Sequence, residues 1–215
     1  IFWMWLVALV GMATAYADST LALLYKSHGA DGMYRGGPAA YIARGLGAPW
    51  LAAIFSVALI LSFGLIFNAV QANSIAEAAS TAFGINKVAV GVGVAILTGV
   101  IIFGGIPQIA RVAEFVVPFM AGFYLLAAII VLVMNIGHVP GILVGIVKSA
   151  FGLQEAVGGV AGSMAAAALN GIKRGLFSNE AGMGSAPNIA AVATPNPHHP
   201  SSQGFVQALG VFIDT

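Results

Sequence analysis

The chain has 215 residues, of which 60% are hydrophobic and only 7% are charged. Soluble domains carry roughly 25% charged residues, so this composition excludes a soluble domain and predicts an integral membrane protein. The formal net charge of +1 and the lack of cysteine argue against a nucleic-acid partner, disulfide bonds and thiolate metal sites.

The first membrane segment is predicted over residues 1–24, an apolar stretch that ends in polar residues. In the loop that follows, glycine, glycine and proline at 36–38 precede a short run over 39–44. Proline is favoured in the first turn of a helix. We therefore expect this run to form a short helix that lies at the membrane interface.

Three more membrane segments are predicted, over residues 49–76, 88–104 and 112–134. The last is the clearest, because residues 115–134 carry no charge and about 20 apolar residues cross a bilayer as a helix. The shorter apolar stretch 140–154 is interpreted as a re-entrant or surface-lying piece.

A fifth segment is predicted to start near Ala156 and to meet a polar, glycine-rich stretch at residues 175–184, whose sequence is GLFSNEAGMG. Irregular backbone inside a bilayer survives only where it is buried in protein or lines a cavity. A break of this kind is the best sequence pointer to the binding site of a transporter. A sixth segment begins near Gln203, so the fold class predicted is an all-α membrane protein with about six membrane segments.

The residues at the two ends of the sequence indicate that the chain is a fragment of a longer protein. Residue 1 is not methionine, and the apolar run at the other end, which includes residues 211–215, is too short to cross a bilayer. We therefore interpret residues 1–215 as a single partial transmembrane domain, truncated within helices at both ends.

Two half-helices, over 156–176 and 181–192, are predicted to meet at residues 177–180. The first would end in free carbonyl groups and the second would begin with free N–H groups. A zwitterionic amino acid suits these ends, with its ammonium at the carbonyls and its carboxylate at the N–H groups. Na⁺ suits the same carbonyls, together with side-chain oxygens of Ser178 and Asn179. The alternative is a packed kink, with the glycines allowing close approach and the polar side chains bonding their own backbone.

Asp214 is predicted to lie near the middle of the sixth membrane segment. An ionisable residue at that depth is functional by default, because burying it is costly. We therefore place Asp214, with the adjacent Thr215, among the cation-binding residues. The alternative is a structural ion pair with Arg174 or Lys173.

On the second membrane segment, Asn68 and Gln71 are three residues apart and share a face of the helix. Such side chains either reach a ligand or form hydrogen bonds with a neighbouring helix. Elsewhere no Ser/His/Asp arrangement has a usable context, and the histidines at 198 and 199 lack a second pair at metal-ligand spacing. We expect neither an enzyme nor a cofactor nor a transition-metal site.

Residues 175–187 and 203–215 closely resemble the alanine/glycine:cation symporter family, whose members are also called sodium:alanine symporters. Residues 36–41 and 70–75 resemble two other sequence blocks of the same family. The resemblance therefore runs along essentially the whole chain.

The resemblance implies a leucine-transporter-type fold, here a partial inverted-repeat transporter bundle with one discontinuous helix. In that fold two five-helix repeats are inverted relative to each other, and the first and sixth helices are broken. Residues 1–215 would hold the second helix to the start of the seventh. The resemblance also implies that Gln71, Phe177, Ser178 and Asn179 contact the amino acid, and we add Gly182 within the break to this substrate site.

The sequence thus predicts a secondary active transporter of the plasma membrane that couples symport of alanine or glycine to Na⁺. One alternative is a proton-coupled amino-acid carrier of the same fold, in which Asp214 or Glu180 titrates. The other is a channel-like or scaffolding bundle of membrane helices. The expected partners are the amino acid, Na⁺ and the lipid bilayer.

Overall fold

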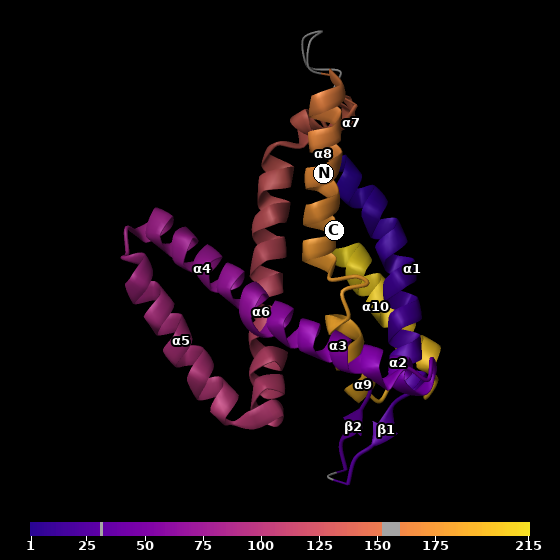
Figure 1. Ribbon diagram of the computed structural model, residues 1–215. Helices are drawn as coiled ribbons and strands as arrows, with labels where there is room; N and C mark the ends of the chain where they lie inside the picture. The colour runs from indigo at the N-terminus through magenta and orange to yellow at the C-terminus, as the bar shows by residue number, and fades with distance from the viewer. Residues whose placement is uncertain (31, 152–159) are drawn as a thin grey trace. The chain divides into compact units, whose positions relative to one another are not determined.

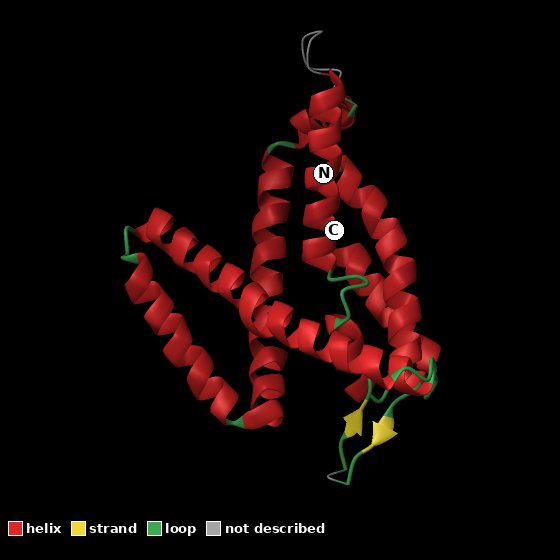
Figure 2. Ribbon diagram, in the orientation of Figure 1, coloured by secondary structure: helices red, strands yellow, loops and turns green. Residues whose placement is uncertain are grey.

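The computed structural model describes residues 1–30, 32–151 and 160–215, and its regular structure is almost entirely helical (Figure 2). The residues form two compact units. The first unit holds Ile1–Ser62 with Ile142–Thr215, and the second holds Phe63–Gly141. The helical fold class is as predicted, whereas a single partial transmembrane domain over residues 1–215 stays a prediction.

The first unit is built around α1 (Phe2–Leu24), which corresponds to the first predicted membrane segment. Later helices that contact α1 include α8 (Val160–Asn179), α9 (Ser185–Val192) and α10 (Pro200–Asp214), and Figure 1 shows α10 in yellow beside α1 in indigo. The buried residues of α1 recur every three or four positions and are mostly small: Ala8, Gly11, Ala15, Ser19, Ala22 and Leu23. This spacing places them on one face of the helix, and small side chains let neighbouring helices approach closely.

A short hairpin and two helices follow α1. Strand β1 (Ser27–His28) pairs antiparallel with β2 (Tyr34–Arg35). Helices α2 (Pro38–Arg44) and α3 (Pro49–Leu59) each begin with a proline, the residue whose fixed φ suits the first helical position. The helix predicted over 39–44 is therefore present, and its location at a membrane interface stays a prediction.

The helix that begins at Pro49 continues to Phe83, beyond the end predicted at residue 76. It comprises α3, the π-helical stretch η1 (Ile60–Phe67) and α4 (Asn68–Phe83). No glycine or proline occurs between residues 76 and 83, and the helix ends only where Gly84 adopts a left-handed φ of 67°. The prediction ended too early because it followed the loss of hydropathy, whereas the stop signal for a helix is the glycine after its last turn.

In the second unit, α4 is followed by α5 (Lys87–Phe103) and α6 (Gly105–Met134). Asn86 caps α5, because its Oδ1 accepts a hydrogen bond of 2.8 Å from the N–H of Val88. A 3-10 turn, η2 (Ile136–His138), then leads to the short helix α7 (Val139–Ala150). This helix covers most of the short apolar piece predicted over 140–154, whose last residues lie outside the described part of the chain, and its re-entrant or surface-lying position stays a prediction.

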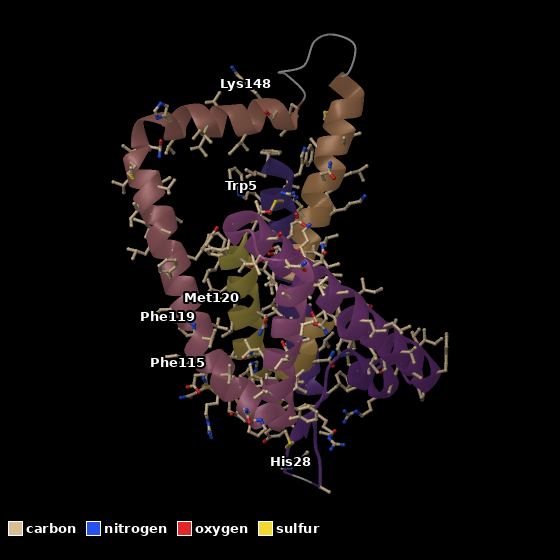
Figure 3. The ribbon with its side chains drawn as sticks, turned by 90° about the vertical axis from the view of Figure 1, so that its left-hand side faces the viewer. Trp5, His28, Phe115, Phe119, Met120 and Lys148 are labelled. Atoms are coloured by element: carbon tan, nitrogen blue, oxygen red, sulfur yellow. The ribbon has the colours of Figure 1, made fainter. Side chains whose placement is uncertain are left out.

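Within the described residues, 3 helices are long and apolar enough to cross a membrane: Phe2–Leu24, Pro49–Phe83 and Pro107–Met134. They correspond to the first, second and fourth predicted segments. The apolar side chains of α6 are exposed, as Figure 3 shows for Phe115, Phe119 and Met120, and exposed apolar surface on such a helix is what contact with lipid requires. The structure is thus that of an integral membrane protein, and the count of six segments stays a prediction.

Ser19 on α1 gives the first testable prediction. Its side chain is 0% exposed, and its Oγ lacks a hydrogen-bond partner among the described residues. Burying an unpaired hydroxyl is costly, so Ser19→Ala should stabilise the protein by about 1 kcal/mol. The thermal midpoint of the purified full-length protein in detergent measures this effect.

The neighbouring Thr20 provides a matched control, because its Oγ1 donates a hydrogen bond of 2.7 Å to the carbonyl of Tyr16. Thr20→Ala removes a satisfied hydroxyl and should leave the midpoint unchanged or lower it. Equal losses of stability in the two variants would show that the buried hydroxyl of Ser19 does not destabilise the folded protein.

Candidate functional site

The helix predicted to break within residues 175–184 is interrupted there. Helix α8 ends at Asn179 and α9 begins at Ser185, and the segment that joins them is drawn as a loop in Figure 2. Glu180, Gly182 and Gly184 have φ values of 49°, 76° and 88°. These left-handed conformations cannot continue a right-handed helix, so the break lies at residues 180–184.

The predicted position of the break, residues 177–180, is therefore wrong by about one helical turn. Phe177, Ser178 and Asn179 form the last turn of α8, where the N–H of Glu180 still donates to the carbonyl of Leu176 at 3.1 Å. The second half-helix starts at Ser185 rather than at residue 181. The glycines fix the break, because they adopt φ > 0 at little cost, whereas Ser and Asn tolerate the end of a helix.

Glu180 bridges the two halves of the interrupted helix. Its backbone N–H belongs to the last turn of α8, and its carboxylate accepts a hydrogen bond from the hydroxyl of Ser185 at the start of α9. A carboxylate is favourable at the amino end of a helix, where the N–H groups create a positive potential. Asn188 of α9 bonds within the start of its own helix, with its Nδ2 2.7 Å from the carbonyl oxygen of Gly184.

The residues of the break pack closely against α1 and α3. A Cβ atom added at Gly182 would lie 3.1 Å from Cγ2 of Thr14, and one added at Gly184 would lie 2.4 Å from Cζ of Phe55. Ala181 belongs to the buried cluster of the unit, with Ala8, Ala15 and Val211. Close packing holds residues 180–184 in place although they form no regular structure.

The end of α8 and the end of α10 meet through two pairs of polar side chains. Ser178 Oγ donates to Asp214 Oδ2 at 2.5 Å, and Thr215 Oγ1 donates to Asn179 Oδ1 at 2.9 Å. These are the residues predicted to bind the cation, and the structure brings them together. Carboxylate, amide and hydroxyl oxygens are the ligands that hard cations prefer. The described partner of Asp214 is Ser178, rather than the basic residues of α8.

An apolar cavity of about 450 Å³ adjoins this polar cluster. Thr215 lines both. Trp5, labelled in Figure 3, lies on the α1 side of the cavity. The remaining lining residues are Phe2, Leu6, Ala8, Leu9 and Met12 of α1 and Phe212 of α10.

Gln71, the other predicted substrate residue, lies on α4 in the second unit and is exposed. Its place beside the break stays a prediction. On the same helix, Asn68 bonds its own backbone, with its Nδ2 3.1 Å from the carbonyl oxygen of Gly64.

Sequence reasoning missed two contacts that join distant parts of the first unit. Lys26 Nζ donates to the carbonyl of Ala193 at 2.9 Å, and Tyr41 Oη lies 3.4 Å from Asp18 Oδ1. Burial and the nearby carboxylate raise the pKa of Tyr41 to about 12, so this phenol remains a hydrogen-bond donor well above neutral pH. Neither contact has a local sequence signal, because the partners are far apart along the chain.

Comparison with known proteins gives a family match over residues 1–215, to the family described as the sodium:alanine symporter family. "Amino-acid carrier protein AlsT" of Bacillus subtilis is 52% identical over 215 residues, which are 100% of this chain and 45% of that protein. "Probable sodium/glutamine symporter GlnT" of the same organism is 48% identical over 215 residues, 100% of this chain and 44% of that protein. "Sodium/alanine symporter AgcS" of Methanococcus maripaludis is 42% identical over 220 residues, 100% of this chain and 47% of that protein. The chain thus spans less than half the length of these relatives.

Proposed function

Because the chain belongs to the sodium:alanine symporter family, a family of transporters rather than enzymes, we propose that the whole protein couples uptake of alanine or glycine to Na⁺ entry. It would act in the plasma membrane, through a leucine-transporter-type fold to which residues 1–215 contribute the second helix to the start of the seventh. The gradient of the cation then drives accumulation of the amino acid, as helix bundles rock around a central site.

The observation that carries this proposal is the interrupted helix with oxygen-bearing side chains at its end. The last carbonyls of α8 lack intrahelical partners and form the negative end of the helix dipole. An ammonium group and Na⁺ are both attracted to such an end. Ser178, Asn179, Asp214 and Thr215, which lie in two hydrogen-bonded pairs, supply the oxygen ligands proposed for Na⁺.

The amino acid is proposed to bind beside this cluster. Phe177, Ser178 and Asn179 in the last turn of α8 and Gly182 in the break are proposed to contact it. Gln71 of α4 is proposed as a further contact, and its place beside the break stays a prediction. The ring of Phe177 acts as a wall that limits the size of the side chain, which favours alanine and glycine over larger amino acids. The N–H groups of the break and of the start of α9 face the carboxylate.

Ion replacement tests the coupling. Uptake of radiolabelled alanine by the full-length protein in proteoliposomes should fall by roughly tenfold or more when choline replaces external Na⁺. Unchanged uptake would exclude Na⁺ coupling. Uptake that instead follows an imposed pH gradient would identify a proton-coupled carrier.

Counterflow separates a carrier from a pore. Vesicles loaded with unlabelled alanine should accumulate labelled alanine transiently, because a carrier exchanges substrate across the membrane one molecule at a time. Competition by unlabelled glycine, alanine and glutamine in the same assay ranks the substrates. A channel-like bundle would give no counterflow.

A further inference from the structure

Lys26 binds the carboxyl end of α9. Its Nζ lies 2.9 Å from the carbonyl oxygen of Ala193, the residue that follows the last helical residue of α9. A cation is favourable there because the terminal carbonyls carry the negative end of the helix dipole. The same Nζ lies 4.0 Å from the centroid of the Tyr34 ring, within the range of a cation–π contact.

The turn between β2 and α2 holds the side of α9. A Cβ atom added at Gly36 would lie 2.7 Å from Cβ of Ala191, and one added at Gly37 would lie 2.0 Å from Oδ1 of Asn188. Only glycine permits such an approach. Helix α9 is therefore held laterally by this turn and at its end by Lys26, and both belong to the segment that follows α1.

Helix α8 is held by α1, which α9 also contacts, and by α10. A Cβ atom added at Gly171 would lie 2.6 Å from Cβ of Trp3, and one added at Gly175 would lie 3.6 Å from Cα of Met4, so α8 packs on the first turns of α1. Its last turn bonds to α10 through Ser178 and Asp214. No continuous helix joins α9 to α8. The bond between Glu180 and Ser185 links the two halves at the amino end of α9, so the position of its carboxyl end depends on the contacts made there.

We propose that Lys26 is a positioning residue for transport, which fixes the carboxyl end of α9 so that its amino end stays beside the substrate and Na⁺ residues of the break. The inference rests on the proposed function. Without the ammonium, α9 departs part of the time from the position that binding requires. The apparent affinity for alanine is then the intrinsic affinity multiplied by the fraction of time that α9 spends in place.

The test compares Lys26→Met, which keeps the length of the side chain but removes the donor and the charge, with Lys26→Arg, which keeps both. In the full-length protein, Lys26→Met should raise the KM for alanine by about tenfold, with a smaller change in the maximal rate. Lys26→Arg should restore a KM near that of the unsubstituted protein. Lys173→Met, at an exposed lysine of α8, is the matched control and should leave the KM unchanged.

A second readout does not require transport. Spin labels on cysteines introduced at Val10 of α1 and Val192 of α9, both exposed, report the distance between the helices, in protein freed of any other cysteine. The distance distribution should be narrow in the unsubstituted protein and in Lys26→Arg, and broadened or shifted in Lys26→Met. An unchanged distribution together with an unchanged KM in Lys26→Met would overturn the proposal.

The two proposals fail in different ways. If uptake by the unsubstituted protein ignores Na⁺, the proposed function is wrong, and the label distances still decide whether Lys26 positions α9. If Lys26→Met does not fold, Tyr34→Leu takes its place, because it keeps Lys26 and removes the ring beneath the ammonium, which also contacts the ring of His28. That variant should raise the KM by about threefold and broaden the distances, and no change in either would contradict the role of Lys26.

Discussion

Gly184→Ala should abolish most Na⁺-dependent uptake and lower the stability of the full-length protein by about 2–5 kcal/mol. Gly184 has a φ of 88°, and a Cβ atom added there would lie 2.4 Å and 3.0 Å from Cζ and Cε2 of Phe55. The left-handed backbone and the steric overlap are separate costs that add. Because Gly184 immediately precedes α9, relief of the overlap displaces the start of that helix. Thermal midpoints in detergent and alanine uptake in proteoliposomes measure the two effects.

Glycines elsewhere separate the two costs. Gly47 has a φ of 68°, and a Cβ atom added there would meet nothing within 4 Å in the part of the chain that the structure describes, so Gly47→Ala should have only the cost of the left-handed backbone, about 1–2 kcal/mol. At Gly91, inside α5, an added Cβ atom would meet no atom of the described residues within 4 Å, and Gly91→Ala should stabilise the helix by up to about 1 kcal/mol. Equal losses of stability for Gly184→Ala and Gly47→Ala would show that the side chain of Phe55 moves aside at no measurable cost.

The break at residues 180–184 shows how far a sequence specifies such a site. Glycines and polar residues within an apolar segment predict that the helix is interrupted, because irregular backbone is costly in a membrane. They do not specify which residue is the last helical one. That depends on where φ becomes positive, which here is at Glu180 and Gly182, on either side of the buried Ala181.

The candidate cation residues were predictable for a different reason. Ser178 and Asn179 attract attention as polar residues within an apolar segment, and Asp214 as an ionisable residue expected within a bilayer. Their pairing across α8 and α10 is a tertiary contact. The contacts of Lys26 with Ala193 and of Gly37 with Asn188 had no sequence signal at all, since a lysine after a membrane segment and a Gly-Gly-Pro turn are ordinary features of membrane loops.

Asp214→Asn should raise the Na⁺ concentration for half-maximal uptake by roughly tenfold or more, a change of about 1.4 kcal/mol per tenfold. Asp214 supplies the only formal charge among the oxygen-bearing residues Ser178, Asn179, Asp214 and Thr215. Two unit charges about 4 Å apart interact by about 4 kcal/mol near a protein surface, so the predicted loss is a modest part of that attraction. Asparagine keeps the shape and one oxygen that accepts from Ser178, so uptake at saturating Na⁺ should remain. The measurement is initial alanine uptake against external Na⁺ at constant ionic strength.

Glu77→Gln is the matched control. Glu77 is an exposed carboxylate that pairs with Lys87 where α4 turns into α5, and its removal should leave the Na⁺ dependence unchanged, because exposed ion pairs contribute little. If Asp214→Asn lowers the thermal midpoint but leaves the Na⁺ dependence intact, the contact with Ser178 is a structural link between α8 and α10. If Asp214→Asn instead abolishes a dependence of uptake on pH, Asp214 is the group that binds the proton in a proton-coupled carrier. Because Asp214→Asn removes a charge and preserves a hydrogen bond, a shift confined to the Na⁺ dependence identifies the charge itself as the feature that binds the cation.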